Sequence, residues 1–188
     1  ARNVGGKMAQ LVTDGGVKGA GWSEPVARSL RDSGVEVACF EQITPNPRAE
    51  EVMAGADMYR EQGCDIIVAV GGGSPMDCAK GIGIVSSNSR HVLEFEGIDE
   101  VPVPGPPLVC IPTTAGTAAE VSQFAIINDT ARLVKIGIIS KAVVPDVALV
   151  DPETTHTMGS HLTACTGLDV LVHAVEAYVS TAHSPITD

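Results

Sequence analysis

Residues 71–73 are three consecutive glycines that leave an apolar stretch and stand directly before Ser74 and Pro75. Serine is a common helix N-cap and proline is common at the first helical position. The sequence therefore predicts a helix with Ser74 as its N-cap and Asp77 where a capping-box acid would stand. The free N–H groups at such a helix end bind anions such as phosphate, and glycines let the anion reach the backbone. The alternative is a tight turn without a ligand, in which Asp77 only stabilises the helix end.

A second polar loop, the stretch IPTTAGTAAEVS at residues 111–122, follows another apolar stretch. Its hydroxyl groups, on Thr113, Thr114 and Thr117, could contact a phosphate or a ribose. An ordinary threonine-rich turn is the alternative, because such turns are common.

Asp14 ends the stretch AQLVTD, at the end of a predicted strand. An acidic side chain there can accept hydrogen bonds from the ribose hydroxyls of adenosine and would repel a 2′-phosphate, which favours NAD over NADP. The alternative is a plain Asp-Gly-Gly turn.

Asp169 and His173 stand four residues apart in a stretch with a helical pattern. Residues at this spacing share one helix face, so a carboxylate and an imidazole could coordinate the same metal ion. Two ligands hold a catalytic metal poorly, and the other histidines show no ligand spacing. Taken alone, the pair is better explained as an Asp–His contact on a helix.

The elements that must position these residues alternate between strand and helix, which predicts an α/β fold with a Rossmann-like parallel sheet and crossover helices. A β-hairpin is expected at residues 121–127 and 133–139. The other strands are predicted at 8–13, 35–43, 66–70, 108–111 and 147–150, and the helices at 23–32, 46–62, 75–85 and 162–179.

The composition of the chain excludes some classes of function. The chain has 188 residues, of which 44% are hydrophobic, so it can bury a core. Its formal charge of −11 argues against nucleic acid as a partner. The five cysteines stand singly, as expected of thiols in a reducing compartment. Neither a signal peptide nor an apolar span of about 18 residues is recognised, so we expect a cytoplasmic protein without a membrane partner.

Five stretches, in order, resemble the iron-containing (group III) alcohol dehydrogenase family: GGGSPMDCAKGIGI, IPTTAGTAAEVS, LVKIGI, PDVALVDPE and LTACTGLDVLVHAVEAYVS. The resemblance extends from about Asp14 to Ser180. It implies a dehydroquinate synthase-like α/β domain followed by an all-helical metal-binding domain. The implied activity is reversible hydride transfer between a primary alcohol or diol and NAD, which gives an aldehyde.

The resemblance also assigns residues. Asp14 and Asn46 match positions on the adenosine side, and Lys135 matches a lysine near the nicotinamide ribose. Asp169 and His173 match two ligands of Fe²⁺ or Zn²⁺, which makes the metal interpretation of this pair the favoured one. The full set of implied NAD contacts is Asp14, Asn46, Gly71, Gly72, Gly73, Ser74, Asp77, Thr113, Thr114, Thr117, Ser122 and Lys135. No catalytic side chain is assigned, because hydride transfer needs no nucleophile.

The chain departs from the family in extent. Further histidine ligands come from a helical region that the family has and this sequence lacks. We therefore expect a dinucleotide-binding domain at residues 1–158 and the start of a truncated helical domain at residues 159–188. Relatives are commonly homodimers, so a homodimer is possible here too. Two alternatives stay open: an NAD-binding module without turnover, and a relative of glycerol dehydrogenase or dehydroquinate synthase.

Overall fold

The computed structural model describes residue 1, residue 3 and residues 5–185. Its centre is a five-stranded parallel sheet in the order β2-β1-β3-β5-β8. The strands are β1 (Met8–Val12), β2 (Glu36–Phe40), β3 (Ile66–Gly71), β5 (Leu108–Pro112) and β8 (Val147–Ala148). The predicted α/β fold with a parallel sheet is confirmed.

The strand order reverses beside β1, because the chain adds β2 on one side and then β3, β5 and β8 on the other. In open parallel sheets, ligands bind outside the carboxyl ends of the strands at such a switch point. The segments that leave β1 and β3 there begin with Asp14 and with the three glycines.

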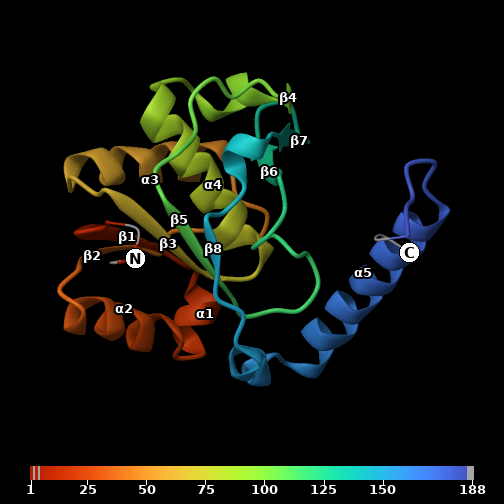
Figure 1. The fold of residues 1–188 in the computed structure, drawn as a ribbon, viewed down its shortest axis with the longest axis horizontal. Coiled ribbons are helices and arrows are strands. Elements are labelled where there is room, and N and C mark those ends of the chain that lie inside the picture. Colours follow the sequence, from red (N-terminus) through yellow and green to blue (C-terminus); the bar gives the residue numbers. More distant parts are fainter. Residues whose placement is uncertain (2, 4, 186–188) are drawn as a thin grey trace.

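Helices cover both faces of the sheet, with α3 and α4 on one face and α1 and α2 on the other (Figure 1). Side chains of β3 alternate between the two cores, so Val68 packs with the α2 side and Ile67 with the α4 side. Strands buried on both faces read as unbroken apolar runs, which is why β3 is so hydrophobic. The helices are α1 (Gly15–Gly19), α2 (Ser23–Asp32), α3 (Ala49–Glu61) and α4 (Gly73–Asn88).

A second, three-stranded sheet lies against α4. The predicted hairpin is present as β6 (Phe124–Asp129) antiparallel to β7 (Val134–Ile139). The short strand β4 (Gly97–Ile98) adds to β7 in parallel and has no clear signal in the sequence. Two 3₁₀ helices connect these parts, η2 (Val92–Phe95) and η3 (Lys141–Val143).

Two predicted helix starts are wrong. Helix α3 begins at Ala49 and not at residue 46, because Asn46 has a left-handed backbone with φ of 58°. Helix α4 begins one residue before Ser74, with Gly72 as its N-cap and without a side-chain cap. Helix α1 was not predicted, because its sequence GGVKG has low helix propensity.

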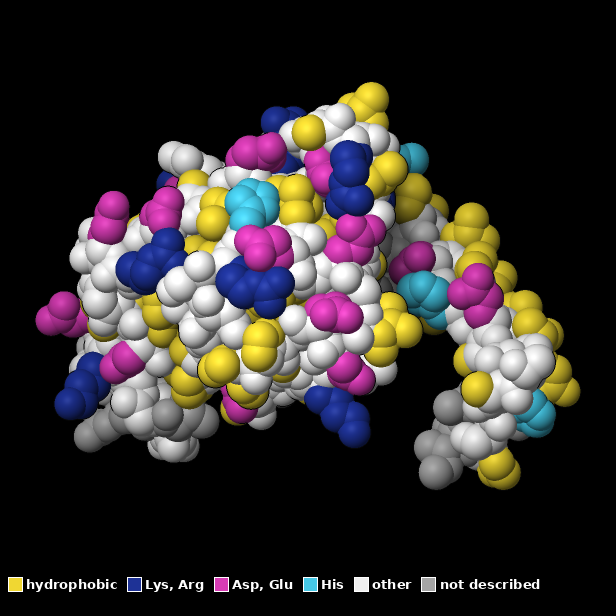
Figure 2. All heavy atoms as spheres, turned by 90° about the horizontal axis from the view of Figure 1, so that it is seen from above, with side chains coloured by type: hydrophobic (Ala, Val, Ile, Leu, Met, Phe, Trp, Pro, Cys, Tyr) yellow, Lys and Arg dark blue, Asp and Glu magenta, His cyan; other side chains and the backbone are white. Residues whose placement is uncertain are grey.

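The last 3₁₀ helix, η4 (Pro152–Thr157), leads into the long helix α5 (Ser160–Val179), which extends away from the α/β body (Figure 1). None of the residues of α5 is buried, and hydrophobic side chains lie along its length (Figure 2). Among the described residues, this is the one helix whose length and composition would also suit a membrane span. The expectation that no apolar span of this size exists is therefore wrong, although a single such helix is weak evidence for a membrane. Residues 186–188 of the predicted second domain lie outside the described part of the chain.

Candidate functional site: a cleft at the carboxyl ends of the strands

A cavity of about 440 Å³ lies at the switch point of the main sheet. Three strand ends contribute to it: the segment after β1, the glycine turn after β3 and the threonine loop after β5. The predicted residues that line it are Asp14, Gly72, Gly73, Ser74, Thr113, Thr114 and Thr117. The structure thus brings together residues that lie up to about 100 positions apart in the sequence.

The side chains packed against residues 71–73 leave little room for a Cβ, so these positions require glycine. Gly71 has φ of 152°, and a Cβ there would lie 2.6 Å from Cγ of Pro75. A Cβ on Gly72 would lie 3.0 Å from Oγ1 of Thr114, and one on Gly73 would lie 3.2 Å from Cγ2 of Thr117. The glycines therefore let the threonine loop approach the backbone of the turn, and this approach forms the wall of the cavity.

The end of α4 at this turn differs from the predicted capping box. No side chain caps the helix, and the Asp77 carboxylate accepts a hydrogen bond from the backbone N–H of Ile126 at 3.1 Å. No side chain occupies the first-turn N–H groups, and Gly73 and Ser74 of this turn line the cavity, so these groups can serve as donors for an anion.

Asp14 is both a cavity residue and a helix cap. Its Oδ1 accepts a hydrogen bond from the N–H of Val17 at 2.9 Å and so begins α1. The carboxylate is held in one place at the end of β1, beside the glycine turn.

Asn46 links three segments near the mouth of the cavity. Its N–H donates to Oγ of Ser74 at 3.1 Å, and its Oδ1 accepts from Nζ of Lys135 at 2.6 Å. Its carbonyl accepts from Nδ2 of Asn128 at 3.0 Å. The hairpin is thereby fastened to the start of α4. Asn46 and Lys135, which the resemblance assigned to different parts of the cofactor, are direct neighbours.

Three polar residues lie behind the cleft. Lys80 is 2% exposed, and its ammonium donates to both the carbonyl and the hydroxyl oxygen of Ser122. Asp77 Oδ1 lies 3.9 Å from Nζ of Lys80. Burial raises the pKa of Asp77 to about 6, and burial lowers the pKa of Lys80. Neither Asp77 nor Ser122 lines the cavity, although both were predicted to contact the cofactor.

Asp169 and His173 share a face of α5, with Oδ2 of Asp169 3.8 Å from Nδ1 of His173. Their side chains are 42% and 54% exposed, respectively. Asp169 lies next to the threonine loop, because a Cβ on Gly116 would lie 3.5 Å from Oδ2 of Asp169. The donor types suit Fe²⁺ or Zn²⁺. Within residues 5–185, however, no group of three or more metal-binding side chains exists, so the pair is an incomplete ligand set.

Comparison with known proteins identifies the family. The family model for iron-containing alcohol dehydrogenases matches residues 1–152, and the model for the C-terminal part of the Fe-containing alcohol dehydrogenase family matches residues 163–188. The chain belongs to the iron-containing alcohol dehydrogenase family. Helix α5 therefore begins the helical domain of this family.

Individual relatives agree with this assignment. The chain is 41% identical over 187 residues to the NAD-dependent methanol dehydrogenase of Bacillus methanolicus, covering 100% of this chain and 49% of that protein. It is 41% identical over 194 residues to the NADPH-dependent butanol dehydrogenase of Clostridium saccharobutylicum, again covering 100% and 49%.

The crystal structure of a 1,3-propanediol oxidoreductase matches with a TM-score of 0.96 and 43% identity, covering 100% of this chain and 49% of that one. The chain thus spans about half the length of the relatives it matches.

Sequence reasoning missed several residues that line this cleft or lie next to it. Trp22 lines the cavity, and its indole N–H donates to Oγ1 of Thr157 at 2.8 Å. Thr166 of α5 also lines it, so the first turns of α5 close one side of the cleft. These contacts join distant segments, and no local pattern signals them. Lys80 had a signal, because it stands three residues after Asp77 on an otherwise apolar helix face.

Proposed function

We propose that this chain supplies the cofactor-binding half and the first metal-binding helix of an NAD-linked, metal-dependent alcohol dehydrogenase. Such an enzyme transfers hydride reversibly between a primary alcohol or diol and NAD, and the product of oxidation is an aldehyde. The convergence of Asp14, the glycine turn and the threonine loop on one cavity carries the proposal. The relatives are named for activity on methanol, butanol and 1,3-propanediol, which supports a small primary alcohol or diol as the substrate.

The cavity suits a dinucleotide in its chemistry. The uncapped end of α4 offers N–H donors to the pyrophosphate, and Thr113, Thr114 and Thr117 add hydroxyl groups to the same cavity. Asp14 Oδ1 caps α1, so Oδ2 is the oxygen that a ribose hydroxyl would reach. A carboxylate at this place disfavours a 2′-phosphate, and so we propose NAD and not NADP.

Asn46 and Lys135 belong to one end of the cofactor in this proposal. Because Nζ of Lys135 donates to Oδ1 of Asn46, the two side chains act as a unit. We place this unit beside the nicotinamide ribose and leave the adenosine end to Asp14. Asp77 and Ser122 act from behind the cleft and hold its wall, since their polar atoms are engaged with Ile126 and Lys80.

Asp169 and His173 would hold the metal from the side of α5 that faces the threonine loop. A divalent ion bound there supplies a Lewis acid for the alcohol oxygen, and the nicotinamide supplies the hydride acceptor. The residues of this chain bind and orient both groups, and the first turns of α5 exclude water from one side of the cleft.

The proposal is tested by titrating the metal-free chain with NADH and, in parallel, with NADPH. Trp22 is the sole tryptophan of the sequence and lines the cavity, so energy transfer to a bound dihydronicotinamide reports binding directly. We expect saturable binding of NADH and at least about tenfold weaker binding of NADPH. If neither binds to a chain that is folded by circular dichroism, the cofactor proposal is wrong.

The metal assignment is tested in a longer version that carries the rest of the helical domain. Replacement of Asp169 or His173 by alanine should abolish metal retention and turnover, while NADH binding survives. Normal turnover in either variant would contradict the assignment.

A second candidate function is an NAD-binding module without turnover. The incomplete ligand set on α5 favours it for the 188-residue chain by itself. Metal stoichiometry and turnover of this chain separate the two functions. A relative of glycerol dehydrogenase or dehydroquinate synthase is disfavoured, because both family models that match describe alcohol dehydrogenases.

We further propose a cytoplasmic protein that forms homodimers and binds neither nucleic acid nor membrane. The net charge of −11 supports the absence of a nucleic-acid partner. We propose the boundary between the two domains at residues 158 and 159, where Gly159 precedes α5.

A further inference from the structure

Lys80 is a buried cation that neither the motifs nor the proposed cofactor contacts explain. Its three N–H donors have three acceptors: the carbonyl oxygen of Ser122 at 3.1 Å, the hydroxyl oxygen of Ser122 at 3.1 Å and the carbonyl oxygen of Phe124 at 2.7 Å. The side chain itself is 0% exposed. An ammonium group this deep is stable only when it is fully hydrogen-bonded, and Lys80 meets this condition with acceptors from a single segment.

The segment it holds is the continuation of the threonine loop. Thr113, Thr114 and Thr117 line the cleft, Ser122 and Phe124 accept from Lys80, and Phe124 is the first residue of β6. Asp77, one turn earlier on α4, accepts from the N–H of Ile126 in the same strand. Two residues on one face of α4 thus fix the far end of the loop through four hydrogen bonds.

The near end of the same loop touches the same helix. Thr114 and Thr117 lie against Gly72 and Gly73 so closely that a Cβ on either glycine would lie within 3.2 Å of them. Helix α4 therefore holds the loop at its first turn and again two turns later at Lys80. The packing of the threonines against the glycine turn, which forms a wall of the cleft, depends on both attachments.

We propose that Lys80 is a positioning residue for the dinucleotide cleft, whose ammonium fixes the segment 122–126 and so holds the threonine loop against the glycine turn. This inference rests on the proposed function, since it assigns the cleft to NAD. Lys80 does not touch the cofactor. It acts through Ser122 and Phe124. The Ser122 hydroxyl therefore serves as an acceptor for Lys80 and not as a contact to the cofactor.

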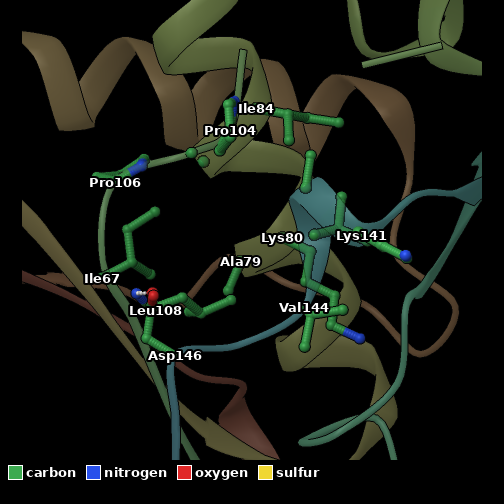
Figure 3. A pocket seen from close by; sticks show the side chains of 14 residues that line it. Ile67, Ala79, Lys80, Ile84, Pro104, Pro106, Leu108, Lys141, Val144 and Asp146 are labelled. Atoms are coloured by element: carbon green, nitrogen blue, oxygen red, sulfur yellow. Dashed lines mark hydrogen bonds between the residues drawn. The ribbon is translucent and has the colours of Figure 1, made fainter. Parts of the chain in front are cut away.

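A cavity behind the cleft supplies a matched control. It measures about 290 Å³ and is lined by the stem of Lys80 and by Lys141. Figure 3 shows both lysines on the side of this cavity opposite Ile67 and Pro106. Lys141 is exposed and belongs to η3. The neighbouring Ser140 donates to the carbonyl oxygen of Gln123, but this bond is made by the backbone and not by the side chain of Lys141. Lys141→Met therefore removes the same charge from the same cavity without removing the anchor.

The test compares Lys80→Met with Lys141→Met in the 188-residue chain by two measurements. The first is NADH affinity from energy transfer, and the second is hydrogen exchange of backbone amides. For Lys80→Met we expect at least a tenfold higher dissociation constant for NADH and faster exchange confined to residues 113–126, with β1 and β3 as protected as before. Lys141→Met should change neither. Faster exchange throughout the sheet would indicate a general structural role and would overturn the proposal, as would unchanged affinity and exchange.

If Lys80→Met does not fold, Ser122→Ala carries the test, because it removes only one of the three acceptors. Faster exchange in residues 113–126 of this variant supports the anchor, and unchanged exchange there overturns it. If the wild-type chain binds neither NADH nor NADPH, the proposed function fails, while the exchange pattern still decides whether Lys80 holds the loop.

Discussion

The proposed cofactor cleft and helix α5, which carries the two proposed metal ligands, differ in how much of each site lies within this stretch of chain. The cleft takes its residues from three strand ends that the parallel sheet brings to one edge, and together they enclose one cavity. Helix α5 contributes one carboxylate and one imidazole, both about half exposed, and has no buried residue. The α/β domain supplies most of the cleft and the first turns of α5 supply one side of it, whereas the proposed metal site has only two of its ligands here.

The difference follows from topology. Crossover connections return every strand of a parallel sheet in the same direction, so consecutive loops meet at the carboxyl edge without help from other domains. A metal site needs three or four ligands, and a single helix face supplies only two at a spacing of four residues. Changes in the cleft should therefore have large effects in this chain, and changes on α5 should have small ones.

Gly71→Ala should produce the largest effect. The new Cβ would stand 2.6 Å from Cγ of Pro75, and φ of 152° is strained for any residue but glycine. We expect the free energy of unfolding to fall by about 2–4 kcal/mol and NADH binding to be lost. Chemical denaturation and the NADH titration measure the two effects.

Gly19→Ala is the control for this variant, because a Cβ on Gly19 meets no atom within 4 Å. It should change the free energy of unfolding by no more than about 0.5 kcal/mol. If Gly71→Ala changes the free energy of unfolding as little as Gly19→Ala does, the turn has room for a side chain and the glycine does not shape the wall of the cleft.

The pH dependence of stability tests the residues behind the cleft. Burial raises the pKa of Asp77 from 3.8 to about 6 in the folded protein, so its contribution to stability is present below about pH 4 and is lost as the pH rises through about 6. This loss amounts to at most about 3 kcal/mol. Asp77→Asn should flatten that part of the profile of unfolding free energy against pH. Asp57→Asn, at a carboxylate 62% exposed on α3, should leave it unchanged, and a profile that is the same in both variants would contradict the burial of Asp77.

Asp14→Asn should alter cofactor choice with little effect on stability. Asparagine caps helices as well as aspartate does, so α1 persists, but the negative charge that disfavours a 2′-phosphate is gone. We expect the ratio of NADPH to NADH dissociation constants to fall by about tenfold, equivalent to about 1.4 kcal/mol. Asp32→Asn, at the end of α2, is the control. A ratio that does not move would place the adenosine ribose elsewhere.

The sequence predicts features set by local patterns better than features set by contacts between distant segments. The strands and the polar residues at their ends follow from local patterns, so the sheet, the hairpin and the turn at residues 71–73 were expected. The role of Asp77 was not, because the hydrogen bond to Ile126 spans 49 positions and competes with the local capping pattern. The left-handed backbone of Asn46 was also not predicted, because Asn46 is held by hydrogen bonds to Ser74 and Asn128, which belong to two other segments.

Alanine at Asp169 or His173 should have the smallest effect in the 188-residue chain. The two side chains are 42% and 54% exposed and lie 3.8 Å apart, so their interaction contributes little. We expect the free energy of unfolding to change by no more than about 0.5 kcal/mol and NADH affinity to stay within about twofold. Added Zn²⁺ at one equivalent should leave the melting temperature unchanged, because a ligand stabilises a protein only when its concentration exceeds its dissociation constant. A rise in melting temperature that Zn²⁺ causes in the wild type and that His173→Ala abolishes would show that α5 already holds a metal. The two side chains of α5 would then suffice to bind Zn²⁺ without further ligands from a longer chain.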